Sequence, residues 1–195
     1  MTAVADSGPP VAARPARIWI VGPMGAGKST TGGAAAVALG WRYLDNDVEL
    51  ARTRGRSARE LAEDGGAAVH AAELAVAGSF FAEPPPLVAT LAASVVDAPA
   101  TVEQMRGSGR VVYLQVPVAV LEQRILGTDR AWLGEDPGAL ASLLAGREAS
   151  FRGCADAILD GTAATSALVG EVVALAGGWW PAARCPVARD ACRKA

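Results

Sequence analysis

Cysteine, an excess of one charge sign and long hydrophobic runs are all scarce in this sequence, and each shortage excludes a class of protein. The three cysteines, Cys154, Cys185 and Cys192, are odd in number and form no CxxC pair, which argues against a disulfide framework and a zinc site. The formal net charge is -2, so bulk charge provides no attraction for nucleic acid. No uninterrupted apolar run approaches the roughly 18 residues of a membrane span. We therefore expect neither a nucleic-acid partner nor a membrane segment.

The N-terminus also lacks the continuous apolar centre of a secretory signal, because Asp6, Pro9 and Pro10 interrupt it. We interpret residues 1–16 as a flexible leader and expect a cytoplasmic protein. The full length of 195 residues suits one domain of ordinary size, which we assign to residues 17–177.

The last residues, 178–195, have no clear periodicity, and we interpret them as a C-terminal tail. The sequence leaves open whether its paired Trp179 and Trp180 dock on the domain or on a partner. With a core large enough to be stable alone, the chain is expected to be a monomer with a small-molecule partner.

Hydrophobic patterns along the domain alternate between strands and helices. The run RIWIVG predicts a strand, and STTGGAAAVALG predicts a helix that Gly40 ends. Further strands are expected over 41–44, 87–96, 110–116 and 157–160, and further helices over 47–55, 57–65, 66–83, 102–107, 118–126, 139–152 and 165–177. This alternation predicts an α/β fold, a three-layer α/β/α sandwich with a central parallel sheet of about five strands.

The stretch GPMGAGKST, residues 22–30, matches the phosphate-binding spacing G-x-x-x-x-G-K-S. It follows a predicted strand and precedes a predicted helix, which is the context that a P-loop needs. Glycines let successive backbone N–H groups point at phosphate oxygens, and the helix adds its positive dipole end. The nucleotide-binding residues are then Gly22, Gly25, Ala26, Gly27, Lys28, Ser29 and Thr30. Such a loop predicts a bound nucleotide and Mg²⁺, with Lys28 on the β- and γ-phosphates and Ser29 as a metal ligand, but by itself it does not distinguish a kinase from a GTPase or a motor.

From this loop onward the chain resembles the shikimate kinase family of P-loop kinases. The likeness includes GPMGAGKST and LGWRYLDNDVELARTRGRSARELAEDGGAAVHAAE, and it resumes at VVYLQV and REASFRGCADAILD. It covers roughly residues 18–176. The resemblance implies an ATP-dependent transfer of the γ-phosphoryl group to a hydroxyl of a polar acceptor.

Two aspartates of the segment LDND correspond to a D-T-D segment of that family. The resemblance implies that Asp45 supports Mg²⁺, usually through water, and that Asp47 binds hydroxyls of the acceptor. Both follow a strand beside the phosphate loop, where α/β sheets bind ligands, and i, i+2 spacing points them the same way while the chain stays extended. Asp47 is then a candidate to orient the attacking hydroxyl and accept its proton. The alternative is structural, with Asp45 in a turn and Asp47 as a helix cap.

A kinase for a carboxylated acceptor needs guanidinium groups that hold the acid and stabilise the transferring phosphate. The resemblance implies that Arg147 pairs with the acceptor carboxylate and that Arg130 reaches the phosphates from a lid, although either could instead be a solvated surface arginine. The family's third arginine is absent, because its F-R reads Val69-His70 here. A histidine cannot form the bidentate fork, so His70 is either a substitute substrate ligand or a packing residue.

A second departure lies at LVATLAAS, where the family has three glycines whose amides approach the substrate and this chain has Leu91, Ala92 and Ala93. We therefore expect either an altered acceptor or a loss of transfer. The leading hypothesis is a shikimate kinase-like phosphotransferase of aromatic amino acid biosynthesis. The alternatives are a nucleotide-binding regulator or pseudokinase of the same fold and a gluconate-type or other sugar kinase.

Overall fold

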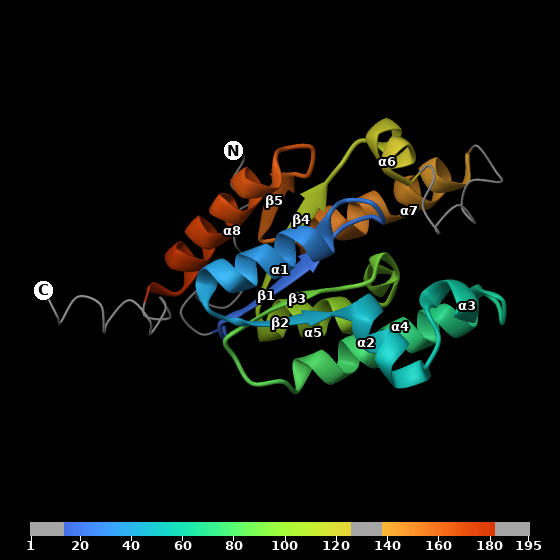
Figure 1. The fold of residues 1–195 in the computed structure, drawn as a ribbon, viewed down its shortest axis with the longest axis horizontal. Helices are drawn as coiled ribbons and strands as arrows, with labels where there is room; N and C mark the ends of the chain where they lie inside the picture. Colours follow the sequence, from blue (N-terminus) through green and yellow to red (C-terminus); the bar gives the residue numbers. More distant parts are fainter. Residues whose placement is uncertain (1–13, 126–137, 182–195) are drawn as a thin grey trace, which may run out of the picture.

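A computed structural model describes residues 14–125 and 138–181 of the chain. Within these residues, five parallel strands form one sheet in the order β2-β3-β1-β4-β5 (Figure 1). The strands are β1 (Arg17–Val21), β2 (Arg42–Asp45), β3 (Leu87–Thr90), β4 (Arg110–Gln115) and β5 (Ala157–Asp160). Because the crossovers between parallel strands run through helices, the predicted α/β class is confirmed.

Helices cover both faces of this sheet (Figure 1). They are α1 (Lys28–Leu39), α2 (Asn46–Arg54), α3 (Ala58–Ala62), α4 (Gly66–Phe81), α5 (Pro99–Ser108), α6 (Val118–Ile125), α7 (Ala139–Cys154) and α8 (Thr165–Trp179), with a 3₁₀ helix, η2, at Ala93–Asp97. Helices α1 and α8 pack on one face, and α4 and α5 pack on the other. No helix in the described ranges is long and apolar enough to cross a membrane.

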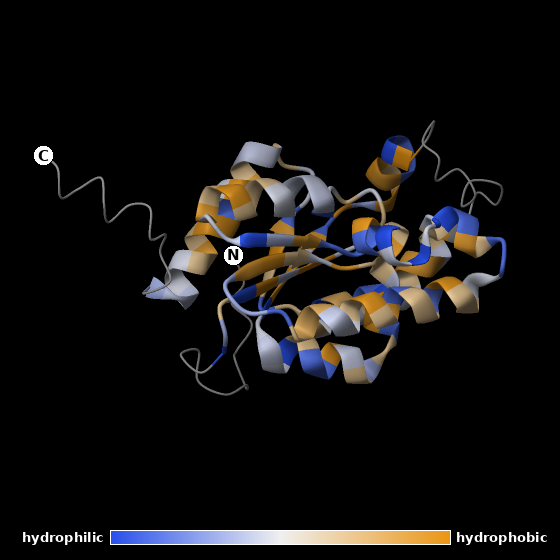
Figure 2. Ribbon diagram, turned by 60° about the horizontal axis from the view of Figure 1, so that its bottom comes forward, coloured by the Kyte–Doolittle hydropathy of each residue, from blue (hydrophilic) through white to orange (hydrophobic). Residues whose placement is uncertain are grey.

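Strand β1 shows why the core has two halves. Its side chains alternate between the faces, so Ile18 and Ile20 join the cluster under α1 and α8, whereas Trp19 and Val21 join the cluster under α4 and α5. All four are fully buried. Figure 2 shows the hydrophobic residues on the central strands and on the helix surfaces turned toward them. A central strand that is apolar on both faces is typical of a covered parallel sheet.

One predicted strand is shorter than expected. The sequence predicts a strand over 87–96, but β3 ends at Thr90 and the chain turns into η2 at Ala93. The neighbouring strands explain this, because β1 ends at Val21 and β2 ends at Asp45. The amide of Leu91 still donates to the carbonyl of Ile20, at 3.1 Å, and beyond that point no neighbouring strand offers a partner.

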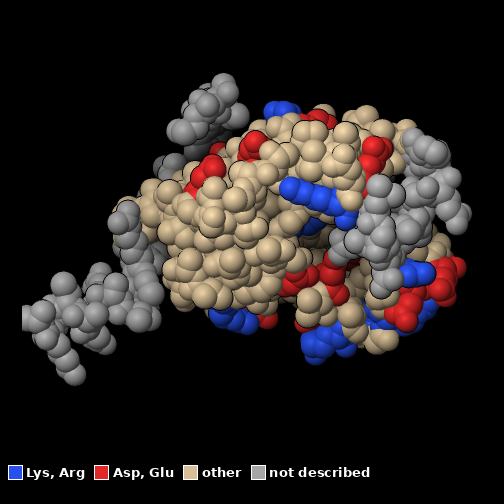
Figure 3. All heavy atoms as spheres, turned by 45° about the horizontal axis from the view of Figure 1, so that its top comes forward, with Lys and Arg blue, Asp and Glu red and all other residues tan. Residues whose placement is uncertain are grey.

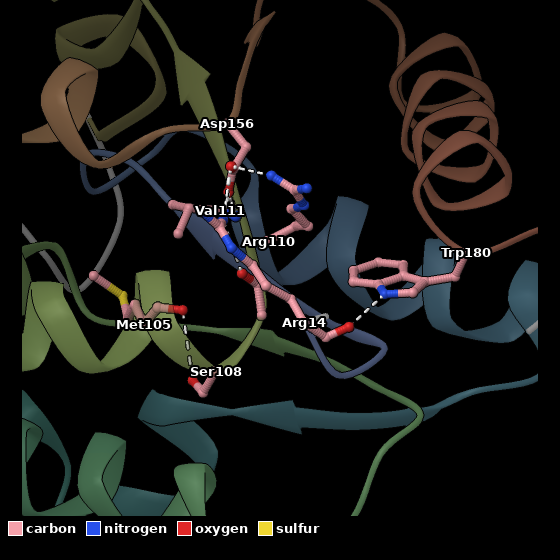
Figure 4. Close-up of polar contacts among 8 residues, drawn as sticks. Arg14, Met105, Ser108, Arg110, Val111, Asp156 and Trp180 are labelled. Atoms are coloured by element: carbon pink, nitrogen blue, oxygen red, sulfur yellow. Dashed lines mark hydrogen bonds and ion pairs between the residues drawn. The ribbon is translucent and has the colours of Figure 1, made fainter. Parts of the chain in front are cut away.

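The opposite end of the sheet is closed by a buried ion cluster (Figure 4). Asp156 accepts from Nη1 of Arg14 at 2.8 Å and from Nη1 of Arg110 at 2.7 Å. The indole of Trp180 donates to the carbonyl of Arg14 at 2.8 Å, and Arg110 stacks over the ring of Trp179. The tryptophan pair therefore docks on the domain, together with Arg14, although the predicted limits 17–177 leave these three residues outside it.

Candidate active site

A cleft of about 260 Å³ lies at the carboxyl ends of β1, β2 and β3. This is the edge at which open α/β sheets bind ligands. Figure 3 shows basic and acidic side chains close together around a hollow on one face of the molecule. The residues lining the cleft are Gly25, Gly27, Lys28, Ser29, Thr30, Asp45, Asn46, Asp47, Thr90, Leu91 and Arg124.

The loop between β1 and α1 has a backbone that only glycine allows. Gly22 has φ +147°, and a Cβ on it would lie 2.7 Å from the carbonyl oxygen of Leu114. Gly27 has φ +86° and immediately precedes α1. The first backbone hydrogen bond of that helix joins the amide of Thr31 to the carbonyl of Gly27, so the amides before it face the N-terminal end of α1. An anion is the natural partner of such amides.

Lys28 is the first residue of α1 and lines the cleft. Its Nζ donates to the carbonyls of Gly22 and Pro23, at 2.9 Å each. These bonds hold the ammonium inside the loop, beside the helix N-terminus. The positive charge of Lys28, the positive end of the α1 dipole and the backbone amides of the loop together fit the phosphates of a nucleotide.

Asp45 is buried at the end of β2 and caps α2. Its Oδ1 accepts from the amides of Asp47, at 2.9 Å, and Val48, at 3.3 Å. Burial alone would raise the pKa of Asp45, but hydrogen bonds from the Ser29, Tyr43 and Thr90 side chains and from a backbone amide outweigh it and hold the pKa below its usual range. The carboxylate is therefore ionised and oriented toward the phosphate loop.

Two neighbours of Asp45 were not expected from the sequence. The hydroxyls of Tyr43, at 2.7 Å, and Thr90, at 2.9 Å, both reach Oδ2 of Asp45. Gly32 makes room for them, since a Cβ there would lie 2.5 Å from Thr90 and 3.1 Å from Tyr43. Burial, chiefly, raises the pKa of Tyr43, so its hydroxyl stays protonated and donates. The sequence signal for this close packing was a small residue, Gly32, on the face of α1 that packs on the sheet.

Asp47 lines the same cleft, but the reason for its position differs from the predicted one. The chain does not stay extended after Asp45. It enters α2 at Asn46, because the Asp45 side chain satisfies the first amides of that helix. Thus Asp45, and not Asp47, is the helix cap, and Asp47 projects exposed from the first turn. Asn46 is buried in the cleft wall, and neither of its amide atoms has a hydrogen-bond partner in the structure.

The donor set suits a hard cation bound together with phosphates. The Ser29 hydroxyl contacts the ionised Asp45, and both are oxygen ligands of the kind that Mg²⁺ prefers. The unpartnered amide of Asn46 adds a further polar group at this wall. The described residues contain no group of three or more His, Cys, Asp or Glu side chains that could hold a metal by themselves. The residues present therefore fit Mg²⁺ that keeps waters and phosphate oxygens in its shell.

The acceptor-side residues gather around Glu73 of α4. Its carboxylate accepts from the hydroxyl of Ser94, in η2. Burial raises the pKa of Glu73, Asp47 raises it further, and the Ser94 hydrogen bond and the charges of His70 and Arg147 oppose this. The three residues that the sequence predicts for acceptor binding, Asp47, His70 and Arg147, therefore all influence the charge of Glu73. His70 itself is half-buried.

Arg147, from α7, is held by a partner that the sequence analysis missed. Its Nε lies 2.9 Å from each carboxylate oxygen of Asp97, the last residue of η2, and its Nη2 also donates to Asp97. The alternative of a fully solvated arginine does not hold, because only 17% of the Arg147 side chain is exposed. Arg130, predicted as the lid arginine, lies outside the described residues.

Arg124 is a further cleft residue that the sequence analysis missed. It projects from α6 and donates to the carbonyls of Gly25, at 3.3 Å, and Gly161, at 3.0 Å. It therefore joins the phosphate loop to the turn after β5. Leu91 also lines the cleft, and its side chain is 1% exposed because it packs into the core on the α4 and α5 face of the sheet. A leucine thus stands where the resemblance implies glycine, as the sequence shows.

Comparison with known proteins places the chain in a family. The family model "Shikimate kinase" matches residues 24–176. A shikimate kinase of Halorhodospira halophila is 39% identical over 152 residues, covering 76% of this chain and 85% of that protein. Shikimate kinase 2 of Serratia proteamaculans is 33% identical over 162 residues, covering 80% of this chain and 92% of that one. The solved structure of Acinetobacter baumannii shikimate kinase in complex with shikimate superimposes with a TM-score of 0.76 at 27% identity, covering 84% of this chain and 93% of that chain. The chain therefore belongs to the shikimate kinase family of phosphotransferases, which act on a hydroxyl group.

Proposed function

We propose that this chain transfers the γ-phosphoryl group of ATP to a hydroxyl of shikimate or of a closely related polar acceptor. The observation that carries the proposal is the cleft that the glycine loop, Lys28, Ser29, Asp45 and Asp47 line together. Family membership and the likeness to an enzyme solved with shikimate support the same acceptor class.

The roles of the phosphate-side residues follow from their positions. The amides at the start of α1 bind phosphate oxygens, and Lys28 leaves its carbonyl partners to hold the β- and γ-phosphates. Ser29 and Asp45 are the residues that would hold Mg²⁺, Ser29 as a ligand and Asp45 as its support. When bound, this ion neutralises charge on the phosphates as the γ-phosphoryl group departs. Gly22, Gly25, Ala26, Gly27 and Thr30 complete the loop.

The acceptor-side roles rest on the cluster around Glu73. Asp47 orients the attacking hydroxyl and accepts its proton, as an exposed carboxylate at the cleft can. His70 and Arg147 bind the remainder of the acceptor. For Arg130, which lies outside the described residues, contact with the phosphates stays a prediction from the resemblance.

Turnover tests this proposal directly. Purified protein is incubated with Mg-ATP and shikimate, and release of ADP and phosphoshikimate is measured against a reaction without acceptor. We expect acceptor-dependent turnover at about 1 to 100 per second, the usual range for kinases. Nucleotide binding in a calorimeter, with no turnover on shikimate or on a panel of hydroxy acids, cyclitols and sugar acids, would refute it.

That negative result would favour the second candidate, a nucleotide-binding regulator of the same fold. The observations behind this candidate are His70 in place of the family's arginine and Leu91, Ala92 and Ala93 in place of its three glycines. The ordered Ser29–Asp45 pair argues against it, because a sensor of nucleotide alone has little need for a carboxylate placed to support catalysis.

A further inference from the structure

The side chain of Arg147 is already bound to a carboxylate of its own chain. Nε and Nη2 both donate to Asp97, in the two-pronged arrangement that arginine otherwise makes with a bound acid. The pair is partly buried, with 17% of the Arg147 side chain and 35% of the Asp97 side chain exposed. A carboxylated acceptor would have to displace Asp97 from Arg147, or accept hydrogen bonds only from the Arg147 N–H groups that Asp97 does not occupy.

The same short helix links Asp97 to the acceptor side. Ser94 of η2 donates to Glu73, and Glu73 lies within electrostatic reach of Asp47, His70 and Arg147. Helix η2 thus carries Asp97, which is bonded to Arg147, and Ser94, which is bonded to a second carboxyl group, that of Glu73. An acid acceptor brings another negative charge to this place, and like charges in a partly desolvated site repel.

An uncharged hydroxyl group is not repelled by these carboxyl groups. A hydroxyl donates to a carboxylate without displacing Asp97, and it adds no charge. A cyclic polyol without an acid group can therefore satisfy Asp47 and its neighbours while the Arg147–Asp97 pair stays closed.

We propose that Asp97 is a specificity-determining residue that occupies Arg147, so that the site prefers an uncharged polyhydroxylated acceptor to an acid of the same shape. The inference rests on the proposed function, because it names the acceptor class of that same site. It departs from the simple expectation that Arg147 is available to clamp a carboxylate.

A matched pair of compounds tests the preference. One is shikimate, and the other is the alcohol in which the carboxylate of shikimate is reduced to hydroxymethyl. Their dissociation constants are measured by calorimetry in the presence of Mg²⁺ and a non-hydrolysable ATP analogue. We expect the wild-type protein to bind the alcohol at least about tenfold more tightly than shikimate, because charge-assisted pairs of this kind are the strong ones.

The variant Asp97→Asn keeps the shape of the side chain and removes its charge. It should tighten shikimate binding at least about tenfold and change alcohol binding less than about twofold. The control is Glu83→Gln, which removes a carboxylate that is also paired with an arginine, Arg42, at 2.8 Å, but lies away from the cleft lining. It should leave both constants unchanged. In an Arg147→Gln background, Asp97→Asn should lose most of its effect on shikimate.

Tighter binding of shikimate than of the alcohol by the wild-type protein, with a ratio that Asp97→Asn does not move, would overturn the inference. Circular dichroism and thermal melting confirm that each variant is folded. Phosphorylation of the two compounds is scored separately from their binding. Binding in the expected order without any transfer would support the specificity inference and would refute the proposed function, so the two failures are distinguishable.

Discussion

The phosphate half and the acceptor half of the cleft are built in different ways. In the phosphate half, backbone conformation sets the binding chemistry, because the positive φ angles of Gly22 and Gly27 shape a loop whose amides can bind an anion. In the half that we propose binds the acceptor, side chains from α4, η2 and α7 contact one another. A backbone cradle tolerates few changes, whereas a set of side chains can be re-paired by one substitution, as the Arg147–Asp97 pair illustrates.

The largest expected effect comes from a substitution in the phosphate half alone. Lys28→Ala removes the cation from the loop, and we expect kcat to fall by about 100- to 1000-fold, as when one preorganised group for transition-state charge is lost. The melting temperature should change little, because the Lys28 ammonium bonds to carbonyls of its own loop, those of Gly22 and Pro23. Steady-state kinetics and thermal melting check both parts. Retained kcat in the folded variant would contradict the assignment of the loop.

Asp45→Asn should have the next largest effect. It removes the charge that supports Mg²⁺, so we expect about a 100-fold lower kcat and a weaker dependence of turnover on Mg²⁺ concentration. The fold should survive, since asparagine caps helices about as well as aspartate does. Asp45→Ala is the matched comparison, because it also loses the cap and should lower the free energy of unfolding by about a further 1 kcal/mol.

The pH dependence of stability gives Asp45 a second readout. Its pKa is lowered in the folded protein, so the charged form stabilises the fold above the ordinary carboxyl pKa of about 3.9. That stabilisation is lost as the pH falls through the lower pKa of the folded state. Acid titrations followed by circular dichroism should therefore show a smaller acid-induced loss in Asp45→Asn than in the wild type. Identical acid titrations would mean that the hydrogen bonds around Asp45 do not favour its charged form.

The contrast between the two halves also explains what sequence could reveal. The spacing of Gly22, Gly27 and Lys28 encodes a backbone shape, so the loop, its helix and the α/β fold were predictable from local pattern. Sequence likewise placed Asp45 at the end of a strand beside the loop. It did not reveal that the Asp45 carboxylate would start α2, because capping depends on where the strand stops.

The acceptor half resisted prediction for a different reason. Its contacts join residues far apart in the chain, such as Asp97 with Arg147 and Ser94 with Glu73. Nothing in the spacing of these residues reports that α7 and η2 pack together. Asp97 is an ordinary acidic residue before a helix until the fold brings Arg147 to it. Tertiary pairing, more than residue type, decides whether that arginine can hold a ligand.

The smallest expected effect concerns the hydroxyl that links η2 to the acceptor side. Ser94→Ala removes the hydrogen bond that favours charged Glu73, so the pKa of Glu73, already raised by burial, should rise further. A carboxyl group with a raised folded pKa stabilises the fold most below its unfolded pKa, and this contribution is lost as the pH rises through the folded value. The variant should therefore match the wild type near pH 4 and be less stable by at most about 1 kcal/mol near pH 8. Urea unfolding at the two pH values measures the difference, with Ser79→Ala as the control, because Ser79 bonds to the backbone carbonyl of Val76. An equal loss at both pH values would show that Ser94 supports packing and leaves the charge of Glu73 unaffected.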